Sequence, residues 1–195
     1  MGAPYRRSDD FPEAVPAPVW QWNHEPVPAG WSLVEKPGTL RLHALPAEGF
    51  LWARNTLTQR VVGPVSTATV TLDASGLRSG DIAGLGLLNM PAAWLGVVRE
   101  GSGRVLRWHA QHGDRHVDVP LRGPVVHLRV SGDYDDDLAR FSFSVDGRRF
   151  DAIGEPVRLP YQLKTFQGTR YALFACARGD GGGGHADFDD FHVDE

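Results

Sequence analysis

Apolar and polar residues alternate with a period of two in several separate stretches of this chain. Clear examples are Thr67–Leu72, Val125–Val130 and Arg140–Val145. No window of about a dozen residues keeps apolar residues at helical spacing. In an alternating strand one face suits a core and the other suits water, as in antiparallel sheets. The alternation therefore predicts an all-β chain.

Turn-forming residues lie between these stretches. Asp146-Gly147 is expected to join the strands 141–145 and 148–152 as a hairpin, because a two-residue Asp-Gly link is a strong hairpin signal. Roughly a dozen short strands at this spacing are typical of a sandwich or barrel. We therefore expect a two-sheet antiparallel jelly roll formed by 1–195 as one domain, with 1–16 as an extended entry segment. The runs Ile82–Leu88 and Trp94–Val98 are apolar on both faces or carry glycine, so they should lie mid-sheet.

Composition excludes several classes of partner. The net charge is −4, and the arginines are scattered among acids, which argues against nucleic acid. No apolar run approaches the length of a membrane helix. The first residues carry no secretory signal, so the sequence predicts a cytoplasmic protein if the chain is complete. The single cysteine, Cys176, is expected to be a buried apolar residue.

The sequence lacks the common enzyme signatures. It has no HExxH, no GxSxG, no phosphate loop and no CxxC pair. A sandwich glycosidase needs two carboxylates flanking a cleft, and the only candidate for alternating acids on an otherwise apolar strand is Asp187–Asp190. These acids lie at the end of the chain, where a closing strand is a poor position for the centre of a cleft. We therefore expect no catalysis by this chain alone.

Acids occur near both chain ends, at Asp9-Asp10 and at Asp187–Asp190. The first and last strands of a sandwich often lie side by side, which would bring these carboxylates together. Carboxylates repel one another unless a cation lies among them, and hard oxygen ligands favour Ca²⁺. The sequence thus predicts a structural calcium ion bound by Asp10, Asp187 and Asp189. The alternative is that these acids only keep an edge strand soluble.

Six tryptophans are many for one core of this size. The stretches Trp20–His24 and Trp52–Arg54 combine flat aromatic faces with hydrogen-bond donors. Sugars bind to such sites by stacking on a ring while amides and guanidinium groups take the hydroxyls. For any single tryptophan, packing in the core remains an alternative.

Four stretches together form a motif pattern typical of a known domain: 20–26 (WQWNHEP), 53–60 (ARNTLTQR), 168–174 (GTRYALF) and 187–191 (DFDDF). With them, the sequence from about Ser8 to Val193 resembles the C-terminal β-sandwich of glycoside hydrolase family 43 β-xylosidases and α-arabinofuranosidases. This resemblance implies a concanavalin A-like jelly roll beside a β-propeller that carries the catalytic acids. It also implies that a loop at Glu48–Trp52 reaches towards the propeller active site, with Phe50 as its aromatic residue. By the same resemblance, Asp189 is the first calcium ligand.

Three functions follow from these observations. The first is a non-catalytic accessory domain that supports a family 43 propeller or shapes its substrate site. The second is a free-standing carbohydrate-binding module for plant cell-wall polysaccharide such as xylan or arabinan. The third and weakest is a complete sandwich glycosidase. We expect the interaction surface on a concave sheet face and its rim, with Trp52 and Arg54 exposed, at these residues: Trp22, Asn23, His24, Phe50, Trp52, Arg54, Gln59 and Trp94.

Overall fold

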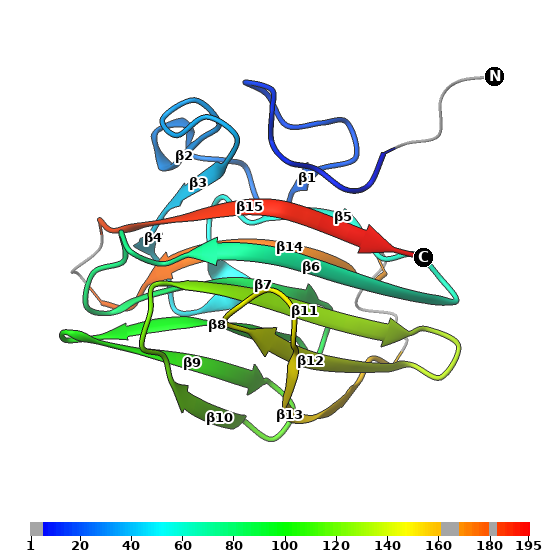
Figure 1. Ribbon diagram of the computed structural model, residues 1–195. Coiled ribbons are helices and arrows are strands. Elements are labelled where there is room, and N and C mark those ends of the chain that lie inside the picture. Colours follow the sequence, from blue (N-terminus) through cyan, green and yellow to red (C-terminus); the bar gives the residue numbers. More distant parts are fainter. Residues whose placement is uncertain (1–5, 161–167, 180–182) are drawn as a thin grey trace.

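Two stacked β-sheets make up the computed structural model of the protein, which describes residues 6–160, 168–179 and 183–195 (Figure 1). The predicted all-β sandwich is confirmed. Two short 3₁₀ turns accompany the strands, η1 (Pro28–Gly30) and η2 (Phe50–Trp52). Within the described ranges, no helix has the length and hydropathy of a membrane-spanning segment.

The eight-stranded sheet has seven strands in a continuous path, and an eighth pairs off that path. The path runs β1 (Gln21–Trp22), β5 (Leu57–Arg60), β14 (Arg170–Ala177), β7 (Asp81–Leu88), β8 (Ala93–Glu100), β9 (Gly103–Ala110) and β10 (Arg115–Pro120). The strand off the path, β4 (Leu45–Pro46), pairs with β14 in parallel, whereas the other pairings are antiparallel.

The seven-stranded sheet is antiparallel throughout. Its order is β13 (Asp151–Arg158), β12 (Leu138–Ser144), β11 (Val125–Asp133), β6 (Val65–Asp73), β15 (His185–Asp194), β3 (Leu40–His43) and β2 (Trp31–Ser32). In Figure 1 the strands β15, β6, β11 and β12 lie side by side in the order that the pairing gives.

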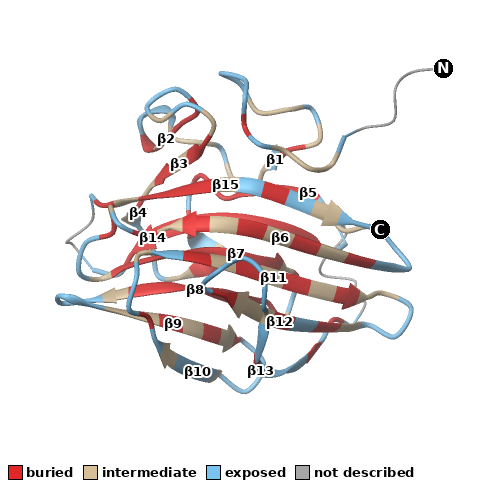
Figure 2. Cartoon of the chain, viewed as in Figure 1, coloured by how far each residue is buried: buried red, intermediate tan, exposed pale blue. Residues whose placement is uncertain are grey.

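The main core lies between the two sheets. Burial along β6 and β11 alternates residue by residue, as the sequence pattern predicts, and Figure 2 shows the alternation as bands along these strands. Val70, Leu72 and Val130 are fully buried on the inner face. By contrast, β7, β8 and β14 are buried on almost every residue, because apolar groups also cover their outer face. The prediction that Ile82–Leu88 and Trp94–Val98 lie mid-sheet is confirmed.

The link between β12 and β13 differs from the predicted hairpin. The strands end at Ser144 and resume at Asp151, so the connection is longer than the two residues Asp146-Gly147. The Asp146 carboxylate accepts the backbone N–H groups of Arg148 and Arg149, at 2.9 and 3.0 Å. These bonds stabilise a wider loop and hold the pKa of Asp146 at about 2.

The two ends of the described chain pair with each other, as the sequence predicts. Asp9 forms an antiparallel bridge with Phe191, and each donates its backbone N–H to the carbonyl of the other. The side chain of Asp9 accepts the indole N–H of Trp20 at 2.8 Å. Phe11 and Trp20 are buried in the main core, so the entry segment is packed on the sandwich from this point.

Candidate interaction site on the eight-stranded sheet

The outer face of the eight-stranded sheet carries a second apolar cluster, separate from the main core. Strands β7, β8 and β14 point one set of side chains into the core and the alternate set outward. The outward set and the η2 segment form what we call the outer cluster: Phe50, Ala53, Ile82, Ala92, Trp94, Val98, Ala172, Phe174 and Cys176. Burial raises the pKa of the Cys176 thiol to about 12, so this cysteine is a packing residue, as expected.

The η2 turn is fixed to the sheet by Phe50. Its ring packs on Phe174 with 4.6 Å between centroids, and only 6% of the residue is exposed. The ring lies directly over Gly86, where a Cβ atom would collide with it. Phe50 can approach the strand this closely because β7 has glycine at that position.

A depression of about 240 Å³ lies beside this turn. Its floor is apolar, and its rim carries the polar groups of Glu48, His109, Gln111 and Arg178. Trp52 also lines it and is 63% exposed, the most exposed tryptophan of the chain. The full lining is Glu48, Gly49, Phe50, Leu51, Trp52, Ile82, Ala92, Trp94, His109, Gln111, Phe174 and Arg178.

Trp94 lies within the depression but has little free surface. Its ring stacks on the His109 imidazole, with centroids 5.5 Å apart and planes 20° apart. It meets Phe174 edge-on at 5.7 Å. Only 5% of Trp94 is exposed, so its ring offers no open face for a sugar.

The remaining predicted binding residues hold the loop or the entry segment in place. The His24 imidazole Nε2 lies 3.0 Å from the carbonyl of Leu51, and the Arg54 guanidinium donates to the carbonyl of Glu25 at 2.7 Å. The amide side chain of Gln59 is buried and donates to the carbonyl of Arg7.

The aromatic stretch before this loop also packs inward. Trp22 packs on Trp31 at 4.9 Å, and the backbone N–H of Asn23 donates to Thr56. The structure thus brings together Phe50, Trp52 and Trp94, with His24 and Arg54 as braces. Trp52 and Arg54 are exposed as predicted, and both precede the strand Leu57–Arg60.

Sequence reasoning missed His109, Gln111, Phe174 and Arg178. Phe174 gave a signal, because β14 is apolar at nearly every position and an outer apolar face needs something to cover it. The other three are single polar residues on separate strands or loops, and only the sheet order brings them together.

The acids at the chain ends are engaged separately. Asp187 is 5% exposed and accepts hydrogen bonds from Arg41 Nε at 2.7 Å and from Lys36 Nζ at 3.1 Å. Burial alone would raise the pKa of Asp187, but the hydrogen bonds from Arg41 and Lys36 outweigh it and hold the pKa below its ordinary value. Asp10 is exposed and pairs with Arg6, while Asp189 accepts the N–H of Asp190.

These contacts bear on the predicted calcium ion. In the part of the chain that the structure describes, no three side chains of the ligating types lie close enough together to hold a metal. The carboxylate of Asp187 already has two cationic partners, so charge neutrality does not require an ion there. Among the described residues no such group of side chains occurs, and the calcium ion stays a prediction from the sequence.

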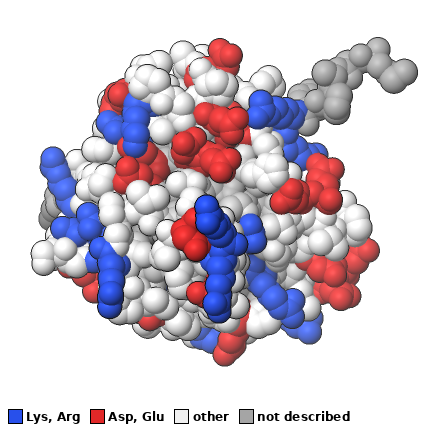
Figure 3. Space-filling model, in the orientation of Figure 1, with Lys and Arg blue, Asp and Glu red and all other residues white. Residues whose placement is uncertain are grey.

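Charged side chains of both signs are interspersed on the face shown in Figure 3.

Two solved structures similar to this chain are parts of longer proteins described as GH43. A protein described as a bifunctional GH43-CE from Bacteroides eggerthii superposes with a TM-score of 0.89 at 36% identity, covering 96% of this chain and 25% of that one. A GH43 glycoside hydrolase engineered to display both endo-xylanase and exo-arabinofuranosidase activity also superposes with a TM-score of 0.89, at 25% identity. That match covers 100% of this chain and 41% of the other.

Relatives found by sequence are also longer proteins. A β-xylosidase of Formosa agariphila is 30% identical over an alignment of 197 positions, which covers 87% of this chain and 32% of the relative. This chain thus spans about a third of that relative's length and matches only an accessory part of such proteins. The model of the β-xylosidase C-terminal concanavalin A-like domain matches residues 8–194. The chain belongs to this family of GH43 C-terminal domains.

Proposed function

We propose that this accessory domain uses the outer face of its eight-stranded sheet to dock against a family 43 catalytic domain. In this proposal Trp52 and the depression beside it help to form the wall of that enzyme's substrate site. The exposure of Trp52 carries the proposal, since a large aromatic ring left 63% exposed beside an apolar depression is typical of a partner surface.

The way in which the loop is anchored supports this proposal. Phe50 fixes η2 on the sheet, the His24 imidazole contacts the carbonyl of Leu51 within that turn, and Arg54, just after it, donates to the carbonyl of Glu25. A loop that is held at several points presents Trp52 in one orientation, which reduces the entropy lost on docking. The resemblance suggested Phe50 as the aromatic that reaches the active site. With Phe50 buried under its own loop, the proposal gives that role to Trp52.

Catalysis is assigned to the other domain. Glycoside hydrolysis uses two carboxyl groups on either side of the scissile bond. Among the described residues, Glu48 is the only carboxylate in the lining of the depression. A single carboxylate cannot supply both the acid and the nucleophile or base, so we expect no turnover of aryl xylosides by this chain alone.

A carbohydrate-binding module is the second candidate function. The free ring of Trp52 and the polar rim formed by Glu48, Gln111 and Arg178 are what a sugar ring needs for stacking and hydrogen bonding. Against it, the ring of Trp94 is covered by His109, so the site offers one stacking platform and not a row of them.

The test compares Trp52→Ala with Val145→Ala, another exposed apolar residue that lies outside the outer cluster. Both are made in the enzyme that contains the catalytic domain, fused or encoded beside this chain. We expect Trp52→Ala to lower kcat/KM on aryl xylosides or arabinosides about tenfold, as loss of a contact worth about 1.4 kcal/mol does. Its melting temperature and the kinetics of Val145→Ala should not change. Unchanged kcat/KM, together with binding of xylan or arabinan oligosaccharides that needs Trp52, would favour the binding module.

A further inference from the structure

Two arginines lie directly opposite each other on neighbouring strands of the eight-stranded sheet. Arg60 of β5 and Arg170 of β14 are paired in the antiparallel register, so their side chains leave the same face. Tyr171, the next residue of β14, is buried in the main core, which places Arg170 on the outer face. Like charges in such a cross-strand pair destabilise a sheet unless an anion compensates them.

Arg170 faces a like charge across the strands and is also buried. It is 6% exposed, and its Nη1 donates to the hydroxyl of Thr58 at 3.2 Å, while its Nε has no hydrogen-bond partner. Burial and the charge of Arg60 both lower the pKa of its guanidinium. In the described part of the chain, neither arginine has a carboxylate partner. Burying an uncompensated charge costs free energy, so a buried arginine without a carboxylate partner indicates a site for an anion.

The surroundings leave room for such a counter-charge. Arg60 is exposed and lines a hollow of about 460 Å³ with Arg7 and Gln21 at the sheet edge formed by β1. Arg7 is already paired with Glu195 at 3.0 Å. The open cation of this hollow is therefore Arg60, and Arg170 is its cross-strand neighbour on β14.

We propose that Arg60 and Arg170 bind a carboxylate side chain of the catalytic domain that docks on this outer face. The proposal rests on the docking function proposed above and adds a charged anchor to its aromatic contact. A guanidinium presents a planar fork that matches the two oxygens of a carboxylate. Leu88 lies opposite Arg170 on β7 and packs on the outer cluster, so the anchor adjoins the docking surface.

The first experiment uses the chain alone and sodium acetate as the probe. The Nε–H resonances of the arginines are followed by NMR while acetate replaces chloride at constant ionic strength. We expect the Arg170 resonance, identified with Arg170→Lys, to shift and saturate with acetate in the wild type and in Arg140→Gln. Arg140 is the control because it is exposed and lies on β12 of the other sheet. In Arg60→Gln the shift should be lost. No saturable shift, or the same shift in Arg60→Gln, overturns the proposal.

The second experiment measures association of the chain with the family 43 catalytic domain of its own genome. Arg60→Gln should raise Kd at least about tenfold and flatten its dependence on NaCl, as loss of a charged interface contact does. If Trp52→Ala weakens association but Arg60→Gln does not, docking stands and the arginine anchor is wrong. If Arg60-dependent binding is instead found for glucuronate-bearing xylan oligosaccharides and not for the catalytic domain, the carboxylate belongs to a sugar and the proposal fails.

Discussion

Replacing Asp187 by asparagine tests whether this buried carboxylate serves an ion-pair network or a metal. In the register of the seven-stranded sheet Asp187 lies between Asp73 on β6 and Arg41 on β3. Lys36 bridges the two acids, at 3.1 Å from Asp187 and 3.3 Å from Asp73. Asparagine keeps the size of the side chain but removes the charge, so Arg41 and Lys36 lose their main counter-ion.

The size of the loss follows from burial. Removing one partner of a fully buried pair costs about 3–5 kcal/mol, and an exposed pair contributes about 1 kcal/mol or less. Here Asp187 is 5% exposed, but the side chains of Arg41 and Lys36 are 18% and 43% exposed. We therefore expect the free energy of unfolding to fall by about 2–3 kcal/mol, which lowers the melting temperature of a domain this size by about 4–12 °C.

The effect should depend on pH. The folded-state pKa of Asp187 is lowered from 3.8, so its contribution to stability is present above that ordinary value. It is lost as the pH falls through the lowered folded-state pKa. The difference between wild type and Asp187→Asn should thus be full near neutral pH and should shrink below about pH 4.

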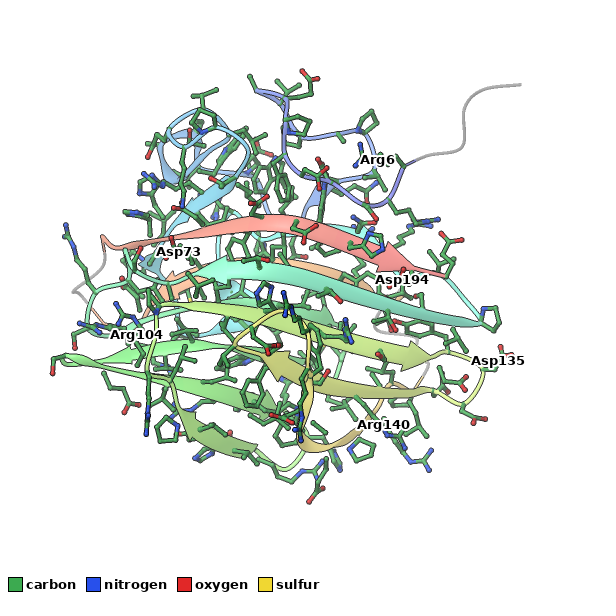
Figure 4. All side chains as sticks on the ribbon, viewed as in Figure 1. Arg6, Asp73, Arg104, Asp135, Arg140 and Asp194 are labelled. Carbon is green, nitrogen blue, oxygen red and sulfur yellow. The ribbon has the colours of Figure 1, made fainter. Side chains whose placement is uncertain are left out.

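Thermal unfolding at several pH values measures these differences, with Asp135→Asn as the control. Figure 4 shows Asp135 at the tip of the β11–β12 loop, at the opposite end of the sheet from Asp73. The ion-pair account is refuted if Asp187→Asn unfolds like the wild type at neutral pH. It is also refuted if EDTA lowers the melting temperature of the wild type but not of the variant, which would make Asp187 a calcium ligand.

Three further changes test the packing. Gly154→Ala should cost more than about 3 kcal/mol in urea unfolding, because the position has a φ of 72° and a Cβ atom there would overlap the ring of Trp108. Tyr171→Phe should cost about 1–2 kcal/mol, since it removes the buried hydroxyl that is hydrogen-bonded to Ser66 at 2.6 Å and to Tyr134 at 3.0 Å. Cys176 should not react with a thiol reagent at pH 8 in the native state, because burial raises its pKa to about 12, and should react on unfolding.

The sheets could be predicted from the sequence because two independent signals agreed, the alternation within strands and the turn residues between them. The β12–β13 link shows the limit of this reasoning. Asp146-Gly147 fits a tight hairpin equally well, but the Asp146 carboxylate caps two later backbone N–H groups and so stabilises a longer loop. Competition between a turn type and a side-chain cap depends on geometry that dipeptide preferences do not encode.

The candidate site was harder to predict because the exposure of a side chain depends on which residues of other strands pack over it. Trp94 and Trp52 are equivalent as sequence signals, yet Trp94 is covered by His109 from the neighbouring strand β9. That contact requires the strand order and register, which local patterns do not give. Gln59 was expected at the binding surface for its hydrogen-bonding groups, but it is buried, and its side-chain amide donates to the backbone carbonyl of Arg7 in the entry segment.

One cross-strand row of the eight-stranded sheet explains why Phe50 anchors the loop while Trp52 stays exposed. Ala172 of β14, Gly86 of β7 and Trp94 of β8 lie in register across the outer face. The two small residues leave a gap in this row, and the ring of Phe50 fills the part of it above Gly86. Because that ring supplies the anchoring, Trp52 is free to extend beyond the loop, and the next row carries the charges of Arg60 and Arg170. Loss of Phe50 should therefore release the loop and lower the stability of the domain, whereas loss of Trp52 or Arg60 should weaken docking without lowering that stability.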